Sequence, residues 1–279
     1  MELIEDKAVM LGQVKAWKGK GKSVGLVPTM GALHQGHLEL VRRSIRENDE
    51  TICSIFVNPL QFNNPEDLAK YPNTMQQDLE SLQNEGCSLV FSPTADLFYK
   101  GVKHKKFDFG ILGEVMEAKF RPGHFEGVAA VISEFFKCVE PNKAYFGEKD
   151  YQQLAVIRWL VKEELFSVEV VACKTVRAES GLALSSRNLR LTNGGVEVAS
   201  DVYKVLSFCR NNKHIFDPET LAENAFAKLS ENFEVEYFEI VDENSFERIE
   251  DWVDTEYPRA FVVAKLEGVR LIDNLSLNN

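Results

Sequence analysis

The stretch SVGLVPTMGALHQGHLELVRRSIRENDETICSIFV, residues 23–57, decides the fold. Its first five residues form a short apolar run that stops at Pro28, which predicts a buried strand followed by a loop. Residues 38–47 carry apolar side chains at helical spacing, and residues 51–57 form a second apolar run. A strand, a helix and a strand in this order predict a parallel crossover unit.

The same alternation continues to residue 173. We predict helices over residues 75–85, 128–139 and 151–165, and strands over residues 88–92, 143–146 and 167–173. Five apolar strands that alternate with helices predict an α/β fold with a doubly wound parallel sheet. In such a sheet ligands bind beyond the carboxyl ends of the strands, so we expect functional residues directly after each strand.

The pattern changes after Lys174. We predict two helices over residues 195–212 and 218–232, then strands over residues 235–241, 259–266 and 269–275, with Glu267 and Gly268 forming a tight hairpin turn. This order of elements predicts a smaller α+β domain. We therefore expect two domains, residues 1–175 and residues 176–279.

The charge and composition exclude several classes of protein. The chain has 32 Lys and Arg against 43 Asp and Glu, a formal net charge of −11, so we expect neither nucleic acid nor an anionic membrane as a partner. The basic run KHKK at residues 103–106 is more typical of a solvated loop. The first 22 residues lack the apolar core of a signal peptide, and the five scattered cysteines fit no disulfide framework. We expect a cytoplasmic protein.

The loop between the first strand and the first helix carries two histidines, His34 and His37. Gly31 and Gly36 allow the backbone to approach a ligand closely. Two imidazoles three residues apart at a helix start can face the same way, and backbone donors there favour an anion. The segment is thus suited to a phosphate chain. The alternative is a pair of solvated loop histidines.

Amide and guanidinium groups follow in two further loops. Asn58 and Gln61, after the second strand, could hold the hydroxyl and carboxylate oxygens of a small acid, although an ordinary polar turn is an equal alternative. Arg121 and His124 lie in a loop rich in Gly and Pro, where Arg121 could bind a carboxylate and the alternative is a helix-entry loop.

The loop after the fourth predicted strand is a candidate phosphate site. Lys149 can neutralise phosphate, and Asp150 can cap the following helix. Gln152 and Gln153 point about 100° apart, so only one of them can face the strand ends. The alternative is a solvated turn of mixed charge.

The last candidate segment begins at the predicted domain junction. Ser185, Ser186 and Arg187 offer two hydroxyl donors and one fixed positive charge, and we expect Gly181 to make the segment mobile. These features suit a phosphate clamp on a closing segment, with a plain linker as the alternative.

Together the motifs PTMGALHQGH, FVNPLQF, RPGHFEGV, YFGEKDYQQLAVIR and GLALSSRN, in this order, resemble the pantoate-beta-alanine ligase family. The similarity is clearest over residues 24–192. The His-x-Gly-His element alone indicates only the wider nucleotidyltransferase superfamily, so another adenylyl- or cytidylyltransferase and a catalytically silent nucleotide-binding subunit remain alternatives. Gln35, Leu60, Asn63, Asn64 and Leu184 depart from the usual family pattern, and none of these departures removes an assigned donor.

The resemblance implies a Rossmann-like nucleotidyltransferase domain and a ligase reaction. The expected reaction is the ATP-dependent condensation of (R)-pantoate with beta-alanine to pantothenate, AMP and diphosphate, through pantoyl adenylate. The family is typically a cytoplasmic homodimer that uses Mg²⁺, whose ligands the sequence does not identify.

The resemblance also implies roles for individual residues. The first ATP-binding stretch comprises Met30, Gly31, Ala32, Leu33, His34, Gln35, Gly36 and His37. The second comprises Gly147, Glu148, Lys149 and Asp150, and the third comprises Val176, Leu184, Ser185, Ser186 and Arg187. The expected catalytic groups are His37, His34, Lys149, Ser185, Ser186 and Arg187. Gln61 and Gln153 are expected to hold pantoate, and Gln61 also to hold beta-alanine.

Overall fold

The computed structural model describes residues 1–102 and 105–278. Lys103 and His104, the first half of the basic run, lie outside the described residues. The chain forms two compact units, which we call the N-terminal unit and the C-terminal unit. The N-terminal unit comprises Met1–Phe109, Glu117–Glu148 and Gln152–Lys174, and the C-terminal unit comprises Gly110–Met116, Lys149–Tyr151 and Thr175–Asn279.

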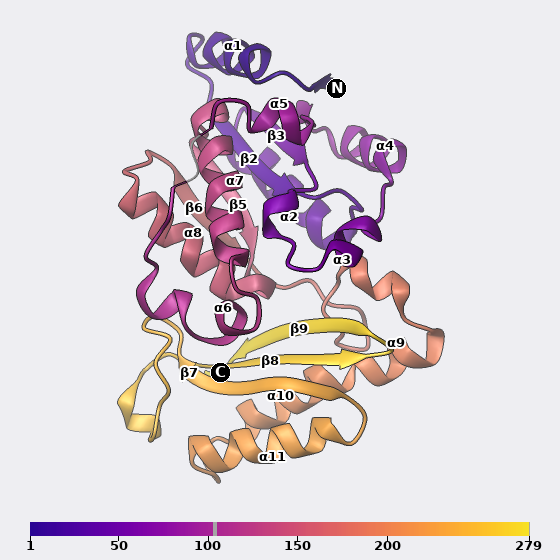
Figure 1. The fold of residues 1–279 in the computed structure, drawn as a ribbon, viewed down its shortest axis with the longest axis vertical. Helices are drawn as coiled ribbons and strands as arrows, with labels where there is room; N and C mark the ends of the chain where they lie inside the picture. The colour runs from indigo at the N-terminus through magenta and orange to yellow at the C-terminus, as the bar shows by residue number, and fades with distance from the viewer. Residues whose placement is uncertain (103–104, 279) are drawn as a thin grey trace. The chain divides into compact units, whose positions relative to one another are not determined.

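The N-terminal unit contains a parallel sheet with strand order β1-β4-β3-β2-β5-β6 (Figure 1). The strands are β1 (Glu2–Ile4), β2 (Val24–Thr29), β3 (Glu50–Ile55), β4 (Leu89–Phe91), β5 (Lys143–Gly147) and β6 (Glu169–Cys173). The predicted doubly wound α/β fold is confirmed. Strand β1 was not predicted, because three residues with one buried side chain give no periodic signal.

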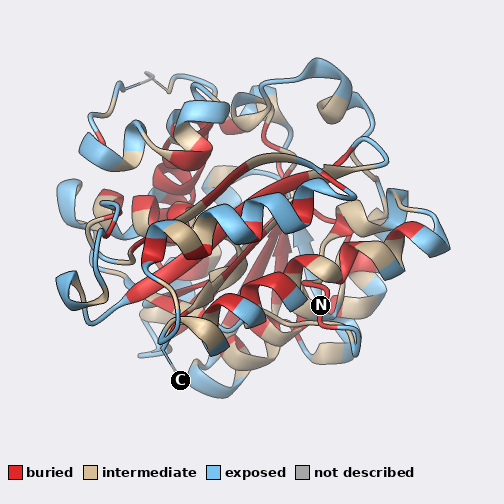
Figure 2. Cartoon of the chain, turned by 90° about the horizontal axis from the view of Figure 1, so that it is seen from below, coloured by how far each residue is buried: buried red, intermediate tan, exposed pale blue. Residues whose placement is uncertain are grey.

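Helices lie between these strands in the chain order, and η2 among them belongs to the C-terminal unit. They are α1 (Lys7–Lys18), α2 (Gln35–Glu47), η1 (Pro59–Gln61), α3 (Pro65–Ala69), α4 (Met75–Glu85), α5 (Ala95–Phe98), η2 (Gly110–Gly113), α6 (Met116–Phe120), α7 (His124–Val139), η3 (Glu148–Asp150) and α8 (Tyr151–Glu163). Helices α2 and α4 pack together over one face of the sheet, where Val27, Val41 and Leu82 join one buried apolar cluster. Right-handed crossovers place α7 and α8 over the opposite face. Figure 2 shows buried residues concentrated on the strands and on one side of the helices.

Strand β2 continues through Pro28 to Thr29, so the predicted stop at this proline was wrong. Pro28 lies opposite Ser54 of β3, whereas the pairing of β2 with β5 covers only Gly25 and Leu26. A proline lacks the N–H that a ladder on both sides would require. Its position beyond the β5 pairing therefore lets the strand continue.

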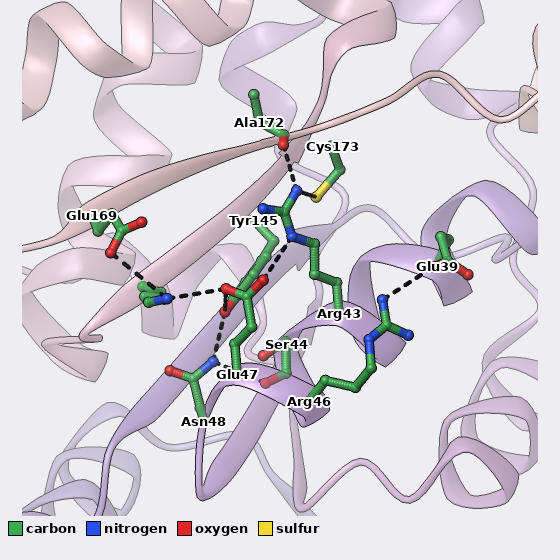
Figure 3. Close-up of polar contacts among 11 residues, drawn as sticks. Glu39, Arg43, Ser44, Arg46, Glu47, Asn48, Tyr145, Glu169, Ala172 and Cys173 are labelled. Carbon is green, nitrogen blue, oxygen red and sulfur yellow. Dashed lines mark hydrogen bonds and ion pairs between the residues drawn. The ribbon is translucent and has the colours of Figure 1, made fainter.

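The C-terminal end of α2 is fixed to the sheet by a charged network. Glu47 accepts hydrogen bonds from Arg43 Nε at 2.8 Å, Lys143 Nζ at 3.0 Å and the Tyr145 hydroxyl at 3.1 Å. Arg43 also donates to the carbonyl of Ala172 at the end of β6, at 2.7 Å (Figure 3). These contacts connect α2 to two neighbouring strands.

The same network determines the ionisation of Glu47. The hydrogen bond from Arg43, followed by that from Lys143, lowers the pKa of the Glu47 carboxyl to about 2. Burial is the main cause that raises the pKa of the neighbouring Tyr145 hydroxyl, so Tyr145 remains a donor. The carboxylate is therefore stabilised in the folded state.

The C-terminal unit contains an antiparallel sheet with strand order β7-β8-β9. Its further elements are η4 (Ser186–Arg190), α9 (Asn193–Ala199), α10 (Asp201–Asn212), α11 (Pro218–Ser230), β7 (Glu234–Asp242), η5 (Trp252–Asp254), β8 (Pro258–Leu266) and β9 (Val269–Ser276). Helix α11 packs on β7, and α10 packs on β8 and β9. Glu267 and Gly268 both have positive φ, as a tight hairpin turn requires. The predicted smaller α+β fold is confirmed.

The predicted helix over residues 195–212 is divided at Ser200. The Ser200 hydroxyl donates to the carbonyl of Glu197 at 2.7 Å, and its backbone N–H donates to the same carbonyl at 3.2 Å. A serine side chain that competes for backbone groups in this way favours a helix end. The apolar pattern alone did not reveal this break.

The cysteines lie in the interior of the protein. All five are free and buried. Within residues 1–102 and 105–278, no helix is long and apolar enough to cross a membrane.

Helix α7 approaches the backbone of η1 closely at Gly127. A Cβ added at this glycine would lie 2.3 Å from the carbonyl oxygen of Leu60 and 2.7 Å from the Cα of Gln61. Both neighbours are backbone atoms, so they cannot be moved by a change of rotamer. Gly127 therefore sets the distance between α7 and the turn that carries Gln61.

Glu47→Gln should lower stability near neutral pH and lose this effect in acid. Because the folded pKa lies below the ordinary value of 4.5, the carboxylate contributes stability above about pH 4.5 and loses it as pH falls towards 2. The side chain is 29% exposed, so we expect a difference of about 1–2 kcal/mol at pH 7. Urea unfolding at several pH values measures it; a difference that does not shrink below pH 4 would contradict the assignment.

Gly127→Ala should lower the free energy of unfolding by about 1–3 kcal/mol, because the new methyl group overlaps backbone. Gly12→Ala is the matched control, since Gly12 also lies inside a helix but has open space at its Cβ position. That change should be neutral or stabilising. Urea titrations of both variants make the comparison, and equal stability of the two would refute the close packing at Leu60.

Candidate active site

The order in which strands are added to the sheet reverses between the neighbouring strands β2 and β5. From β2 the chain proceeds through α2 to β3 on one side, and from β5 it proceeds through α8 to β6 on the other. Ligands of doubly wound sheets bind at such a switch point, beyond the carboxyl ends of the strands. Residues 30–37 follow β2 directly, and Gly147 ends β5, so two predicted binding segments begin there.

His34 and His37 cap helix α2 with their own ring nitrogens. The Gly36 N–H donates to Nδ1 of His34 at 3.1 Å, and the His34 N–H donates to Nδ1 of His37 at 3.4 Å. The two rings lie side by side, with centroids 4.1 Å apart. This capping explains why α2 begins at Gln35, three residues before the predicted start.

The capping bonds also determine which ring nitrogen of each histidine is protonated. An Nδ1 atom that accepts a hydrogen bond carries no proton, so a neutral ring must carry its proton on Nε2. Each imidazole is then a donor through Nε2. The predicted face-sharing of the two histidines is present, and both side chains are half-buried.

Most backbone donors of this segment are already used inside the protein. The paired N–H groups belong to Gly31, Ala32, Leu33, His34, Gly36 and His37. Their acceptors are a threonine hydroxyl, a buried carboxylate, the two Nδ1 atoms and a backbone carbonyl. These N–H groups already have acceptors inside the protein, and the expectation that backbone amides of this segment favour an anion stays a prediction. The side chains of His34 and His37 add ring nitrogens to the polar groups of this segment.

The buried carboxylate is that of Asp78 on α4, which sequence reasoning missed. It accepts from the N–H groups of Ala32 at 2.9 Å and Leu33 at 2.8 Å. A detectable signal existed, since Asp78 lies four residues before Leu82 and thus shares the buried face of its helix. An acidic side chain on a buried face needs a partner.

Gln61 lies beside Met30, so the segments after β2 and β3 meet. Its Nε2 lies 2.9 Å from the Met30 sulfur, and its Oε1 accepts from Asn58 Nδ2 at 3.1 Å. Asn58 also caps η1 by accepting from the Leu60 N–H, and it accepts from the Tyr99 hydroxyl at 2.7 Å. The amide of Gln61 thus has a fixed orientation. Asn58 is buried and serves as its support.

Arg121 and His124 support the backbone of Gln61. Nδ1 of His124 donates to the Gln61 carbonyl at 2.8 Å, and Nη2 of Arg121 donates to the same oxygen at 3.3 Å. Nη1 of Arg121 lies 3.1 Å from Nε2 of His124 and 3.4 Å from a carboxylate oxygen of Glu117. A guanidinium can only donate, so His124 is the neutral Nδ1–H form. Arg121, considered as a carboxylate-binding group, here contacts Glu117 of the protein itself.

Of the two adjacent glutamines on α8, Gln152 is buried and Gln153 is half-buried. Oε1 of Gln152 accepts from the Glu117 N–H at 3.0 Å, which assigns it to the protein interior. Gln153 belongs to the N-terminal unit, like Gln61 and the two histidines.

Lys149 and Asp150 belong to the C-terminal unit. The Lys149 carbonyl accepts from Nδ2 of Asn274 at 2.9 Å, while its Nζ lies 3.9 Å from Asp150. Asn274 is buried on β9 and also accepts from Arg259 at 2.7 Å. A residue at the far end of the chain therefore fixes the backbone of Lys149, which the local sequence could not reveal.

The segment from Val176 to Leu184 forms a hairpin in the C-terminal unit. The Leu184 N–H donates to the Val176 carbonyl at 3.0 Å, and Arg177 forms an ion pair with Asp273. At Gly181 φ is 91°, and an added Cβ would lie 2.3 Å from the Tyr203 ring. This glycine allows a tight turn against Tyr203, and the mobility expected of the segment stays a prediction.

The predicted phosphate clamp begins a short 3₁₀ helix. Ser185 caps η4 by accepting from the Arg187 N–H at 3.3 Å, Ser186 is buried, and Arg187 is half-buried. The structure thus brings Ser185, Ser186 and Arg187 together with the hairpin that precedes them. Met30, His34, His37 and Gln61 belong to the N-terminal unit.

Comparisons with known proteins agree with this fold and with the motif order. Residues 2–276 match the family model "Pantoate-beta-alanine ligase". A pantothenate synthetase from Cytophaga hutchinsonii is 46% identical over 92% of this chain and 93% of its own length.

Two solved structures are also similar. Pantothenate synthetase from Thermus thermophilus is 38% identical, with a TM-score of 0.93 and full coverage of both chains. A pantoate-beta-alanine ligase from Francisella tularensis, complexed with beta-gamma ATP and beta-alanine, is 33% identical, with a TM-score of 0.82 and coverage of 99% and 98%. The predicted pantothenate-forming ligase activity is confirmed at the level of the family. On the residues matched and on the identity over nearly the whole length, the chain belongs to the pantoate-beta-alanine ligase family.

Proposed function

We propose that this chain condenses (R)-pantoate with beta-alanine in two steps driven by ATP. A pantoate carboxylate oxygen attacks the α-phosphorus of ATP, and diphosphate leaves, which forms pantoyl adenylate. The amine of beta-alanine then attacks the acyl carbon, and AMP leaves with the former carboxylate oxygen. The observation that carries the proposal is the pair of histidines whose Nδ1 atoms cap α2 at the switch point of the sheet.

His34 and His37 are proposed to act on the ATP phosphates through their Nε2–H groups. Negative charge grows on the phosphate oxygens and on the leaving diphosphate during the first step. Donors already fixed in place stabilise this charge without reorganisation. His37 holds the proton-donor position of the family, and the other residues of the first ATP stretch, Met30 to Gly36, line the same ligand.

Gln61 and Gln153 are proposed to hold pantoate, and Gln61 also to hold beta-alanine. The amide of Gln61 is oriented by Asn58 and Met30, and its carbonyl is supported by His124 and Arg121. A fixed amide presents donor and acceptor atoms to hydroxyl and carboxylate oxygens at little entropic cost. This placement suits the acid more than the nucleotide.

Residues of the C-terminal unit are proposed to complete ATP binding. Lys149 and Arg187 would neutralise phosphate charge, and Ser185 and Ser186 would donate hydroxyl hydrogen bonds. The further members of the second and third ATP stretches are Gly147 and Glu148 of the N-terminal unit and Asp150, Val176 and Leu184 of the C-terminal unit. Residues 1–175 and 176–279 are proposed as two domains, of which the smaller excludes water from the adenylate.

Mg²⁺ is proposed to enter with the nucleotide. Among the residues that the structure describes, no group of three or more His, Cys, Asp or Glu side chains is placed to hold a metal ion. Mg²⁺ fits this chain nevertheless, because it commonly binds through substrate phosphates, water and one or two carboxylates. Its contribution when bound would be to neutralise phosphate charge. A homodimer in the cytoplasm is proposed from the family resemblance.

Product analysis tests the reaction. The chain is supplied with ATP, Mg²⁺, (R)-pantoate and beta-alanine, and each component is omitted in turn. We expect pantothenate, AMP and diphosphate in equal amounts only in the complete mixture. Turnover of a phosphorylated metabolite in place of pantoate would favour another adenylyltransferase of the superfamily, and ATP binding without turnover would favour a silent subunit.

His37→Ala should lower adenylate formation by about 100-fold or more, since one preorganised donor to the developing charge is lost. Pantoate-dependent exchange of labelled diphosphate into ATP measures this step alone. His214→Ala, which changes an exposed histidine of the C-terminal unit, is the control and should retain full exchange. An unchanged rate in H37A would remove His37 from the mechanism.

Gln61→Ala should weaken pantoate binding more than ATP binding, by about 10-fold or more for pantoate, because the lost amide faces the acid. Gln83→Ala, on the exposed side of α4, is the matched control. Calorimetric titration with each ligand separates the two affinities. Equal losses for pantoate and ATP would contradict the assignment.

A further inference from the structure

A buried carboxylate accepts hydrogen bonds from the segment that carries the two histidines. Asp78 is 3% exposed, and its two oxygens accept from the backbone N–H groups of Ala32 and Leu33 at 2.9 and 2.8 Å. The Thr74 hydroxyl contributes a third hydrogen bond, to Oδ2 at 3.1 Å. One side chain thus takes both backbone donors that directly precede His34.

The backbone at these positions has an unusual conformation that needs such a partner. Gly31 has a φ of 79° and Ala32 has a φ of 49°. The left-handed region is strained for a residue with a Cβ and persists only where surrounding contacts enforce it. A Cβ on Gly31 would lie 3.1 Å from Oδ2 of Asp78. The carboxylate therefore fits closely against this turn.

We infer that Asp78 is a positioning residue for His34 and His37. By holding the Ala32 and Leu33 N–H groups towards α4, it fixes the turn from which His34 enters the helix as its cap. The two Nδ1 atoms then receive backbone N–H groups, and the two Nε2–H groups become the donors for the nucleotide. The inference rests on the proposed function for the role of Nε2, whereas the clamp itself rests on the hydrogen bonds.

The carboxylate is chemically required for this clamp. Asp78 offers acceptors on both oxygens, and each faces a backbone donor. An asparagine has one acceptor and one NH₂ group, so Asp78→Asn would place a donor against a donor. A buried N–H without an acceptor is costly, so the turn would reorganise. The change is small in volume and removes the clamp selectively.

The experiment compares D78N with E80Q. Glu80 lies on the exposed side of the same helix, so E80Q removes the same charge without contact to the turn. The first readout is the nitrogen-15 spectrum of the histidine rings, with signals assigned by single substitution of each histidine. In the wild-type chain His34 and His37 should be Nε2–H tautomers. In D78N their Nδ1 shifts should move towards a mixture of tautomers, whereas E80Q should leave them unchanged.

The second readout is kinetic. D78N should lower kcat for the complete reaction by about 10- to 100-fold, because a small displacement of catalytic groups slows the reaction strongly. KM for pantoate should change by less than about 3-fold. E80Q should retain both parameters. A loss confined to stability, with the ring tautomers and kcat of the folded D78N unchanged, would overturn the inference.

Thr74→Val keeps the test valid if D78N does not fold. It leaves the carboxylate in place and removes only the hydroxyl donor. We expect a smaller shift of the same ring signals and a decrease in kcat of about 2- to 5-fold. Unchanged ring signals in T74V would then contradict the inference. The ring spectra do not depend on turnover. If the wild-type chain shows no ligase activity but D78N still changes the tautomers, the proposed function is refuted and the role of Asp78 in positioning the histidines stands.

Discussion

The candidate site depends on one unusual form of helix capping, in which imidazole nitrogens replace the usual serine or aspartate. His34 and His37 accept backbone N–H groups through Nδ1 at the start of α2. Capping therefore performs two tasks with the same atoms. It satisfies donors that a helix start leaves unpaired, and it fixes the proton of each neutral ring on Nε2. A residue with only one polar atom could cap the helix, but it could not also present a second donor.

Other residues of the N-terminal unit fix both ends of α2. At one end of α2, Asp78 holds the turn before His34; at the other end, Glu47, Arg43 and Tyr145 fix the helix to β5 and β6. Around Gln61 the support is also charged and largely buried. Such networks are costly when one member is missing, because a desolvated partner is left unpaired. This cost is the physical reason why the site residues cannot rearrange one at a time.

The sequence predicted the elements with strong apolar periodicity and most of the site segments. The helix over residues 75–85 agrees with α4 at both ends, and the motif order identified the family. Local pattern failed where distant contacts decide the structure. Strand β1 exists because β4 pairs with it, Gly181 leaves no room for a Cβ beside Tyr203, and the Lys149 backbone is fixed by Asn274 on β9. Asp78 differs from these, since an acid on the buried face of an amphipathic helix was visible and was not interpreted.

The proposed function requires an acidic chain to bind two anionic substrates. A net charge of −11 opposes this at long range, but salt screens charges that lie more than about 10 Å from a ligand. What matters is the sign of the groups that contact the phosphates. The carboxylate of Asp78, which contacts the histidine segment, accepts from three hydrogen-bond donors, two of them backbone N–H groups. Its charge is thus used to hold the turn that precedes His34. An acidic protein can therefore favour an anion locally where the carboxylate beside the site is engaged by its own backbone donors.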